Sequence, residues 1–135
     1  MRIIGLDWGE ARIGVAVSDP LGITAQALCT LENNDKFIGK LKVLIGQYGA
    51  AEIVIGLPKN MKGEAGVAAE KTMSFYNEIS SLIPLKITLW DERLSTKMAQ
   101  RYLEVSGASR KKQKSFIDAA TAGIILQGYM DSKKT

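Results

Sequence analysis

The stretch RIIGLDWGEARIGVAVS, residues 2–18, contains two β-rich runs separated by a short turn. The first run, Arg2 to Asp7, is apolar and ends in an acidic residue, whereas the second extends from Arg12 to Ser18. Because so few residues separate the two runs, they predict a β-hairpin. The run from Gly22 to Leu31 follows a Pro-Gly-containing turn and predicts a third antiparallel strand. We therefore expect the chain to begin as a three-stranded meander.

The rest of the chain alternates between helical and β patterns. Apolar residues at helical spacing predict a helix from Phe37 to Tyr48, opened by Asn34 or Asp35 and closed by Gly49. The order β-β-β-α-β-α-β-α-α predicts an α/β fold: a mixed five-stranded sheet with helices on both faces and the first strand at its centre. The other expected elements are strands at 52–58 and 85–90 and helices at 67–83, 95–107 and from Ser115 through 116–130.

Length and composition exclude several classes of protein. The 135 residues suit one domain, 1–135. The absence of histidine excludes Ser-His-Asp and Cys-His catalysis and histidine-ligated zinc, and the lone Cys29 excludes an internal disulfide. We find neither a signal peptide nor an apolar run of membrane-spanning length, and we expect a cytoplasmic protein. The net charge of +4 suits an anionic partner.

Acidic side chains follow two of the predicted strands and interrupt the last predicted helix. Asp7 ends the first strand, Glu92 follows the last strand, and Asp118 stands among Ala and Ile residues. If they converge, these carboxylates form an all-oxygen site for two Mg²⁺ or Mn²⁺ ions, which can hydrolyse a phosphodiester without histidine. Side-chain alternation allows only one of Asp91 and Glu92 to face that site. The competing interpretations are turn capping by Asp7 and an exposed first-turn Asp118 with Ser115 as helix cap.

Basic residues gather in the second half of the chain. Between Lys86 and Lys114, eight Lys and Arg residues stand against three acidic residues. The run from Arg110 to Lys114 is expected to form a loop that holds a phosphate backbone beside the carboxylates, and a merely solvated loop is the alternative. The loop after Pro58 is also basic but lacks the P-loop pattern. Our candidate substrate-binding residues are Arg12, Lys59, Asn60, Arg93, Arg110, Lys111, Lys112 and Lys114.

Three side chains near the strand ends each have two interpretations. Trp8 and Trp90 adjoin acidic residues and would stack on unpaired bases. Large aromatic residues at strand ends more often pack against the sheet or a helix, and we favour packing for both. Arg12 lies across the hairpin turn from Asp7, where it either orders that carboxylate or contacts a substrate.

Four sequence blocks carry a family resemblance. They are GLDWGEARIGVAVSDPLG (5–22), IVIGLPKNMKGEAG (53–66), WDERLST (90–96) and FIDAATAGIILQGYM (116–130). Together and in this order they resemble the YqgF (RuvX) family of bacterial ribonuclease H-like proteins, and the resemblance spans nearly the whole chain. It implies a ribonuclease H-like fold. The family's acidic positions fall on Asp7, Glu92 and Asp118, which implies that these three residues are catalytic and bind the metal.

The resemblance also implies a function. We expect a divalent-metal-dependent endonuclease that acts on structured RNA, processes the 5′ end of 16S ribosomal RNA precursor and meets ribosomal particles. One alternative is a Holliday junction resolvase-like nuclease acting on branched DNA in recombination or repair, which would work as a symmetric dimer. The other is a ribosome-associated RNA-binding module without catalysis. The sequence identifies no dimer surface, so monomer and homodimer both stay open.

Overall fold

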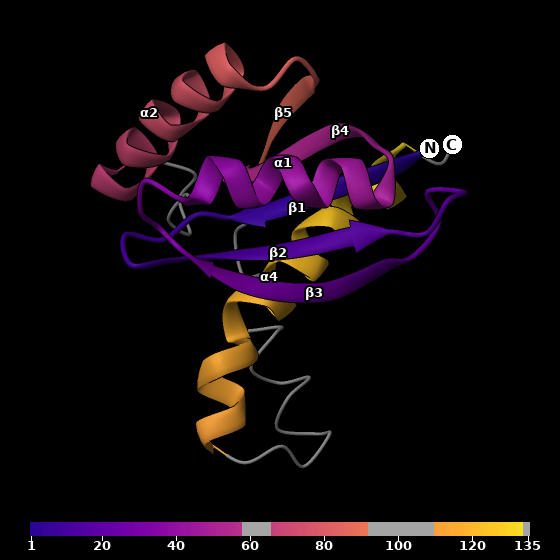
Figure 1. The fold of residues 1–135 in the computed structure, drawn as a ribbon. Coiled ribbons are helices and arrows are strands. Elements are labelled where there is room, and N and C mark those ends of the chain that lie inside the picture. Colours follow the sequence, from indigo (N-terminus) through magenta and orange to yellow (C-terminus); the bar gives the residue numbers. More distant parts are fainter. Residues whose placement is uncertain (58–65, 92–109, 134–135) are drawn as a thin grey trace.

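The computed structural model describes residues 1–57, 66–91 and 110–133 (Figure 1). The helix expected at 95–107 lies outside these residues. In chain order, the described elements are β1 (Arg2–Asp7), β2 (Arg12–Ser18), β3 (Ala25–Glu32), α1 (Phe37–Tyr48), β4 (Ala50–Leu57), α2 (Val67–Leu82), β5 (Lys86–Asp91) and α4 (Arg110–Ser132).

The strands form one mixed sheet with the order β3-β2-β1-β4-β5. β1 pairs antiparallel with β2 and parallel with β4, and β4 pairs parallel with β5. The predicted five-stranded mixed sheet with a central first strand is therefore confirmed. Because β1, β4 and β5 run in the same direction, their carboxyl ends share one edge of the sheet.

Side-chain alternation divides the core into two layers. On β1, Ile4 and Leu6 belong to the cluster under α1 and α2, whereas Ile3 packs into the cluster under α4. On β4, Ile53 and Ile55 face the first layer and Val54 faces the second, so this strand is buried on both faces as its apolar run predicts. Figure 1 shows α1 and α4 on opposite sides of the sheet, which confirms the prediction of helices on both faces.

Helix α4 rests directly on the backbone of the sheet, because two glycines lie beneath it. A Cβ atom added to Gly14 would lie 1.9 Å from the carbonyl oxygen of Asp118. A Cβ atom added to Gly5 would lie 2.8 Å from the Cβ atom of Leu126. Both distances are too short for non-bonded atoms, so this helix position requires glycine at both places.

The beginning of α4 differs from the sequence prediction. We expected a basic loop at 109–115 and a helix capped by Ser115, but the helix begins at Arg110. The prediction was wrong because Arg, Lys and Gln are good helix formers, so a basic run can continue a helix as readily as it can interrupt one. Asp118 consequently lies beyond the second turn of α4, and the first-turn interpretation of this residue is also wrong.

The remaining boundaries agree with the sequence to within a few residues. Gly49, with φ of 64°, ends α1 as predicted. Strand β3 begins at Ala25 instead of Gly22, because the backbone amides of Ile23 and Thr24 donate to the Asp19 carboxylate at 2.6 and 3.0 Å. The hydrogen bonds from Thr24 and Ile23 hold the pKa of Asp19 below its ordinary value. Within the described ranges, no helix is long and apolar enough to cross a membrane.

Candidate functional site

Asp7 and Asp118 come together through Gly14. Asp7 pairs with Gly14 across the β1–β2 ladder, and such cross-strand partners lie roughly 5 Å apart. Alternation from Ile3 and Gly5 places the Asp7 position on the α4 face of the sheet. The backbone of Asp118 packs on Gly14 from that same face. The backbones of two acidic residues more than a hundred positions apart in sequence therefore lie on either side of Gly14, at the carboxyl end of β1.

The Asp118 side chain forms an ion pair with Arg12. The Nε atom of Arg12 lies 3.3 Å from Oδ2 of Asp118, and the two side chains are 52% and 25% exposed. Arg12 is two residues before Gly14 on β2, so both positions belong to the α4 face. The sequence predicts that Arg12 lies near Asp7, whereas its contact with Asp118 was not predicted.

Asp118 belongs to the sheet-facing side of α4, as its helical spacing predicts. Ala122, Ile125 and Tyr129 lie on the same side of the helix and are buried. Asp118 is partly exposed because it lies near the sheet edge, where the buried side of α4 meets solvent. Its carboxylate is therefore fixed by a packed helix and remains accessible.

Glu92, the third predicted carboxylate, lies outside the described residues. The preceding strand, β5, ends at Asp91, and β4 lies between β5 and β1. Two strand spacings, about 10 Å, therefore separate the end of β5 from Asp7. Among the residues that the structure describes, no group of three His, Cys, Asp or Glu side chains could hold a metal ion. The carboxylates of Asp7 and Asp118 are hard oxygen donors of the kind that Mg²⁺ and Mn²⁺ prefer, and two such residues alone do not complete a site.

The basic run occupies the first turns of α4. At 1.5 Å per residue, Lys114 and Arg110 lie about 6 and 12 Å along the helix from Asp118. Figure 1 shows this part of α4 extending beyond β3. The helix thus fixes the backbone of the run relative to Asp118, which a loop would not do. Three other predicted substrate-binding residues, Lys59, Asn60 and Arg93, lie outside the described ranges.

Comparison with known proteins identifies the family of this chain. Residues 1–132 match the model of the RuvX family, described as Holliday junction resolvase. The chain belongs to the RuvX family. It is 46% identical to a candidate pre-16S rRNA nuclease of Desulforamulus reducens, over 98% of both chains. It is also 47% identical to a protein of the same description from Clostridium kluyveri, over 97% of both chains. The family resemblance is confirmed.

Solved structures show the fold class of this RuvX family member. The Fowlpox virus resolvase, solved with Holliday junction DNA, matches with a TM-score of 0.60 at 12% identity over 100% of both chains. The RuvC protein of T. thermophilus, solved with a Holliday junction substrate, matches with a TM-score of 0.58 at 11% identity over 98% of this chain and 96% of that chain. The RuvC-like ribonuclease H fold is therefore confirmed.

Both tryptophans pack against neighbouring aromatic rings, as we favoured. The centroid of Trp8 lies 6.3 Å from that of Phe75 on α2, and Trp90 meets Tyr129 on α4 edge-on at 5.8 Å. Beside Trp8, a cavity of about 450 Å³ is lined by Trp8, Gly9, Glu10, Val67, Ala68, Lys71 and Thr72.

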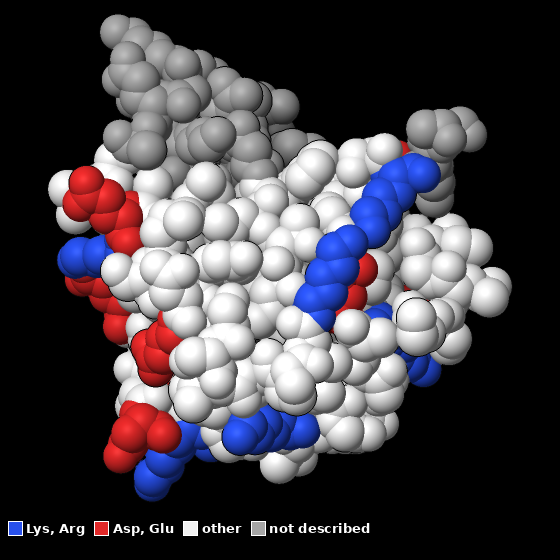
Figure 2. Space-filling view, turned by 90° about the horizontal axis from the view of Figure 1, so that it is seen from above, with Lys and Arg blue, Asp and Glu red and all other residues white. Residues whose placement is uncertain are grey.

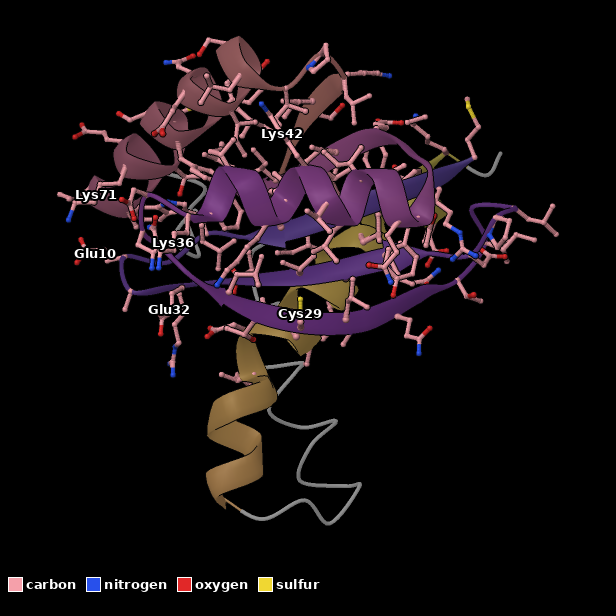
Figure 3. All side chains as sticks on the ribbon, in the orientation of Figure 1. Glu10, Cys29, Glu32, Lys36, Lys42 and Lys71 are labelled. Carbon is pink, nitrogen blue, oxygen red and sulfur yellow. The ribbon has the colours of Figure 1, made fainter. Side chains whose placement is uncertain are left out.

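Glu10 and Lys71, which both line this cavity, form an ion pair (Figure 3). Figure 2 shows the side of the molecule where α2 and β5 lie, with acidic and basic groups around a largely uncharged middle. This described surface therefore offers no concentrated positive charge for a nucleic acid.

A second carboxylate, Glu52, anchors the other end of α4. Glu52 is at the start of β4 and its side chain is 14% exposed. It accepts hydrogen bonds from the hydroxyls of Tyr129 and Thr88. Lys86 and Lys133 each place Nζ 3.9 Å from a Glu52 oxygen. The contact with Tyr129 and the charge of Glu52 raise the pKa of Lys133. No local sequence pattern pointed to this network.

Proposed function

We propose that this chain is a divalent-metal-dependent endonuclease that cleaves structured RNA, processing the 5′ end of 16S ribosomal RNA precursor. The observation that carries the proposal is the placement of Asp118 on Gly14, the cross-strand partner of Asp7. In a chain of the RuvX family, this convergence joins two acidic residues at the carboxyl end of the central strand. Relatives described as candidate pre-16S rRNA nucleases support the choice of substrate.

Glu92 is our proposed third metal ligand. Trp90 packs against α4, on the same side of the sheet as the Asp7 position. In an extended chain, position 92 shares a side with position 90 and position 91 faces the opposite side. Alternation therefore favours Glu92 over Asp91. Mg²⁺ or Mn²⁺ ions held by these carboxylates would supply an activated water and neutralise charge on the phosphate.

The basic start of α4 is our proposed phosphate-binding surface. Arg110, Lys111, Lys112 and Lys114 occupy about two helical turns that lead to Asp118. Neutralising all four residues should lower the slope of log K against log[salt] for RNA binding by about 3, since each phosphate contact contributes roughly 0.7 to 0.9. Neutralising Lys36, Lys40 and Lys42 near α1 serves as the control. An unchanged slope in the variant with all four α4 residues neutralised would contradict phosphate binding and would mean that the basic run is only a solvated surface.

Cleavage of defined substrates tests the proposed activity. Purified protein is incubated with precursor 16S rRNA in Mg²⁺, Mn²⁺ or EDTA. We expect cleavage only with a metal ion, and a loss of about 100-fold or more in Asp7→Asn, Glu92→Gln and Asp118→Asn, because each change removes a charge that the ions need. Asp91→Asn serves as the control. Parental rates in Asp7→Asn and Asp118→Asn would contradict the proposal, and RNA binding without cleavage would favour a non-catalytic module.

The second candidate function is cleavage of branched DNA, and the family description as Holliday junction resolvase favours it. An RNA-processing enzyme should lose affinity when deoxyribose replaces ribose near the cut, because the 2′-hydroxyl is lost. A junction resolvase should cut an all-DNA four-way junction and form a symmetric dimer on it. Junction cleavage without precursor cleavage would make this candidate the better one.

The proposed function also has a cellular setting. We propose that residues 1–135 act as one domain in the cytoplasm, in contact with ribosomal particles. Co-sedimentation of the protein with precursor-containing particles tests the contact. Sedimentation that is the same with mature particles would contradict a role in precursor recognition.

A further inference from the structure

We propose that Arg12 is an internal competitor of the metal ions: it holds Asp118 in the free protein and moves to a substrate phosphate when cations bind. This inference rests on the proposed function. Its direct observation is the contact of 3.3 Å between Nε of Arg12 and Oδ2 of Asp118. The guanidinium occupies the space beside this carboxylate oxygen, and a divalent cation bound to the same oxygen would need that space.

The exposure of both partners makes the exchange physically easy. The Arg12 side chain is 52% exposed, so its guanidinium can leave Asp118 without opening the core. Ion pairs of this kind are weak, because water solvates both charges. Asp118 itself stays in place, since the backbone of α4 is packed against Gly14. The helix therefore fixes the carboxylate, and the arginine is the partner that can move.

A second carboxylate is available to Arg12 on the neighbouring strand. Arg12 is the register partner of Glu32 on β3, which is labelled in Figure 3. Glu32 accepts a hydrogen bond from the side chain of Asn34 at 3.2 Å. The ion pair of Arg12 is instead with Asp118, which belongs to helix α4. Glu32 is thus a second acidic residue at a position paired with Arg12, and the half-exposed guanidinium would remain in solvent after its release from Asp118.

Charge repulsion determines whether cation affinity rises or falls when the Arg12 charge is removed. A positive guanidinium beside Asp118 repels any divalent cation that approaches this carboxylate. Removal of the Arg12 charge should therefore strengthen cation binding by the free protein. The same removal should weaken binding of the nucleic acid, because a phosphate partner is lost. A purely structural ion pair would not produce these opposite changes.

The experiment measures Mn²⁺ binding without substrate, by the electron paramagnetic resonance signal of the free ion. Arg12→Gln is expected to tighten Mn²⁺ binding by about three- to tenfold, the range of a partly solvated charge interaction. Arg12→Lys keeps the charge and should stay within about twofold of the parent. Lys86→Gln is the matched control, because it removes one positive charge and an ion pair with Glu52 at the opposite end of the sheet.

A second measurement records RNA affinity with all proposed metal ligands intact, in Ca²⁺ instead of Mg²⁺ to prevent cleavage. Arg12→Gln should weaken RNA binding and lower the salt slope by about 0.9, whereas Lys86→Gln should change neither. Mn²⁺ binding that is unchanged or weaker in Arg12→Gln would overturn the competitor role, even if the parent cleaves RNA normally. Absence of Mn²⁺ binding in both the parent and Arg12→Gln would overturn the metal-dependent function and the inference together.

Discussion

The two ends of α4 attach to the sheet through carboxylates in very different surroundings. At one end, Glu52 is mostly buried and receives two hydroxyl donors and two lysines. At the other end, Asp118 is more exposed and pairs with the half-exposed Arg12. Both contacts connect the helix to a strand. The Glu52 end has its partners supplied by the fold, whereas the Asp118 end keeps a carboxylate that solvent can reach.

The difference separates a structural carboxylate from a candidate catalytic one. A buried charge is stable only when the protein surrounds it with partners, which leaves it little capacity for a ligand. A carboxylate that binds an ion must instead be held in place without being fully enclosed. At Asp118, backbone packing on Gly14 provides the positioning and leaves the oxygens at the surface.

The largest loss of stability is expected from Gly14→Ala, which disrupts the packing of α4 on the sheet at the Asp118 end. The new methyl group would lie 1.9 Å from a helix carbonyl oxygen, so α4 must move away from β2. We expect a loss of about 3 kcal/mol or more in the free energy of unfolding, measured with urea. The affinity for Mn²⁺ should fall together with the stability, since the displaced helix carries Asp118.

Gly39→Ala provides the control for that variant. Gly39 is inside α1 and a Cβ atom there would have no neighbour within 4 Å. Alanine should therefore raise the free energy of unfolding by up to about 1 kcal/mol, through better helix propensity. Equal effects of the two substitutions would show that α4 does not depend on its close approach to Gly14.

The next largest loss of stability is expected from Glu52→Gln, which removes the charge of the carboxylate at the Glu52 end of α4. The amide keeps the shape of the side chain but loses the charge that Lys86 and Lys133 approach. We expect the free energy of unfolding to fall by about 2 kcal/mol, with cleavage unchanged. Tyr129→Phe should lose about half as much, because it removes one hydrogen bond. A large loss of cleavage in a stably folded Glu52→Gln would contradict the separation of the two ends.

A smaller stability effect is expected from Asp118→Asn. Its partner Arg12 is half-exposed, and such pairs contribute less than about 1 kcal/mol. Thermal and urea unfolding should therefore differ little from the parent, although we expect cleavage to be lost. If Asp118→Asn destabilises the protein as much as Glu52→Gln, Asp118 has a structural role that its exposure does not suggest.

The smallest effect, with the opposite sign, is expected from Thr30→Val. Thr30 is the register partner of Gly14, and its buried hydroxyl has no hydrogen-bond partner within the described part of the chain. Replacing an unsatisfied hydroxyl by a methyl group should leave the free energy of unfolding unchanged or raise it by up to about 1 kcal/mol. A measurable loss of stability on urea unfolding would mean that the hydroxyl has a partner in solution.

Much of the fold could be predicted because its signals are local. The β-rich runs at 2–7 and 12–18 predicted the hairpin, and the apolar run that begins at Glu52 predicted a strand buried on both faces. The spacing of Asp118, Ala122 and Ile125 predicted the sheet-facing side of α4. Each of these patterns depends on the periodicity of one element alone.

The remaining features depend on residues that are distant in sequence. The contact between Arg12 and Asp118 exists because α4 crosses β2, and neither segment encodes that crossing by itself. A usable signal was overlooked: Gly14 and Ala16 are small residues at alternate positions, which is typical of a strand face that a helix approaches closely. Lys and Arg at the start of α4 misled us because their charge suggested solvent exposure, whereas their helix propensity was not weighed.

The position of Asp7 in the first strand and Asp118 in the last described helix also determines when the site can form during synthesis. All five strands of the described residues leave the ribosome before α4 does. A nascent chain that contains the whole sheet still lacks Asp118. Its Ala16 and Val54 are not yet covered by α4. The pair of carboxylates is therefore assembled only when α4 docks, so a partly synthesised chain cannot carry the proposed nuclease site.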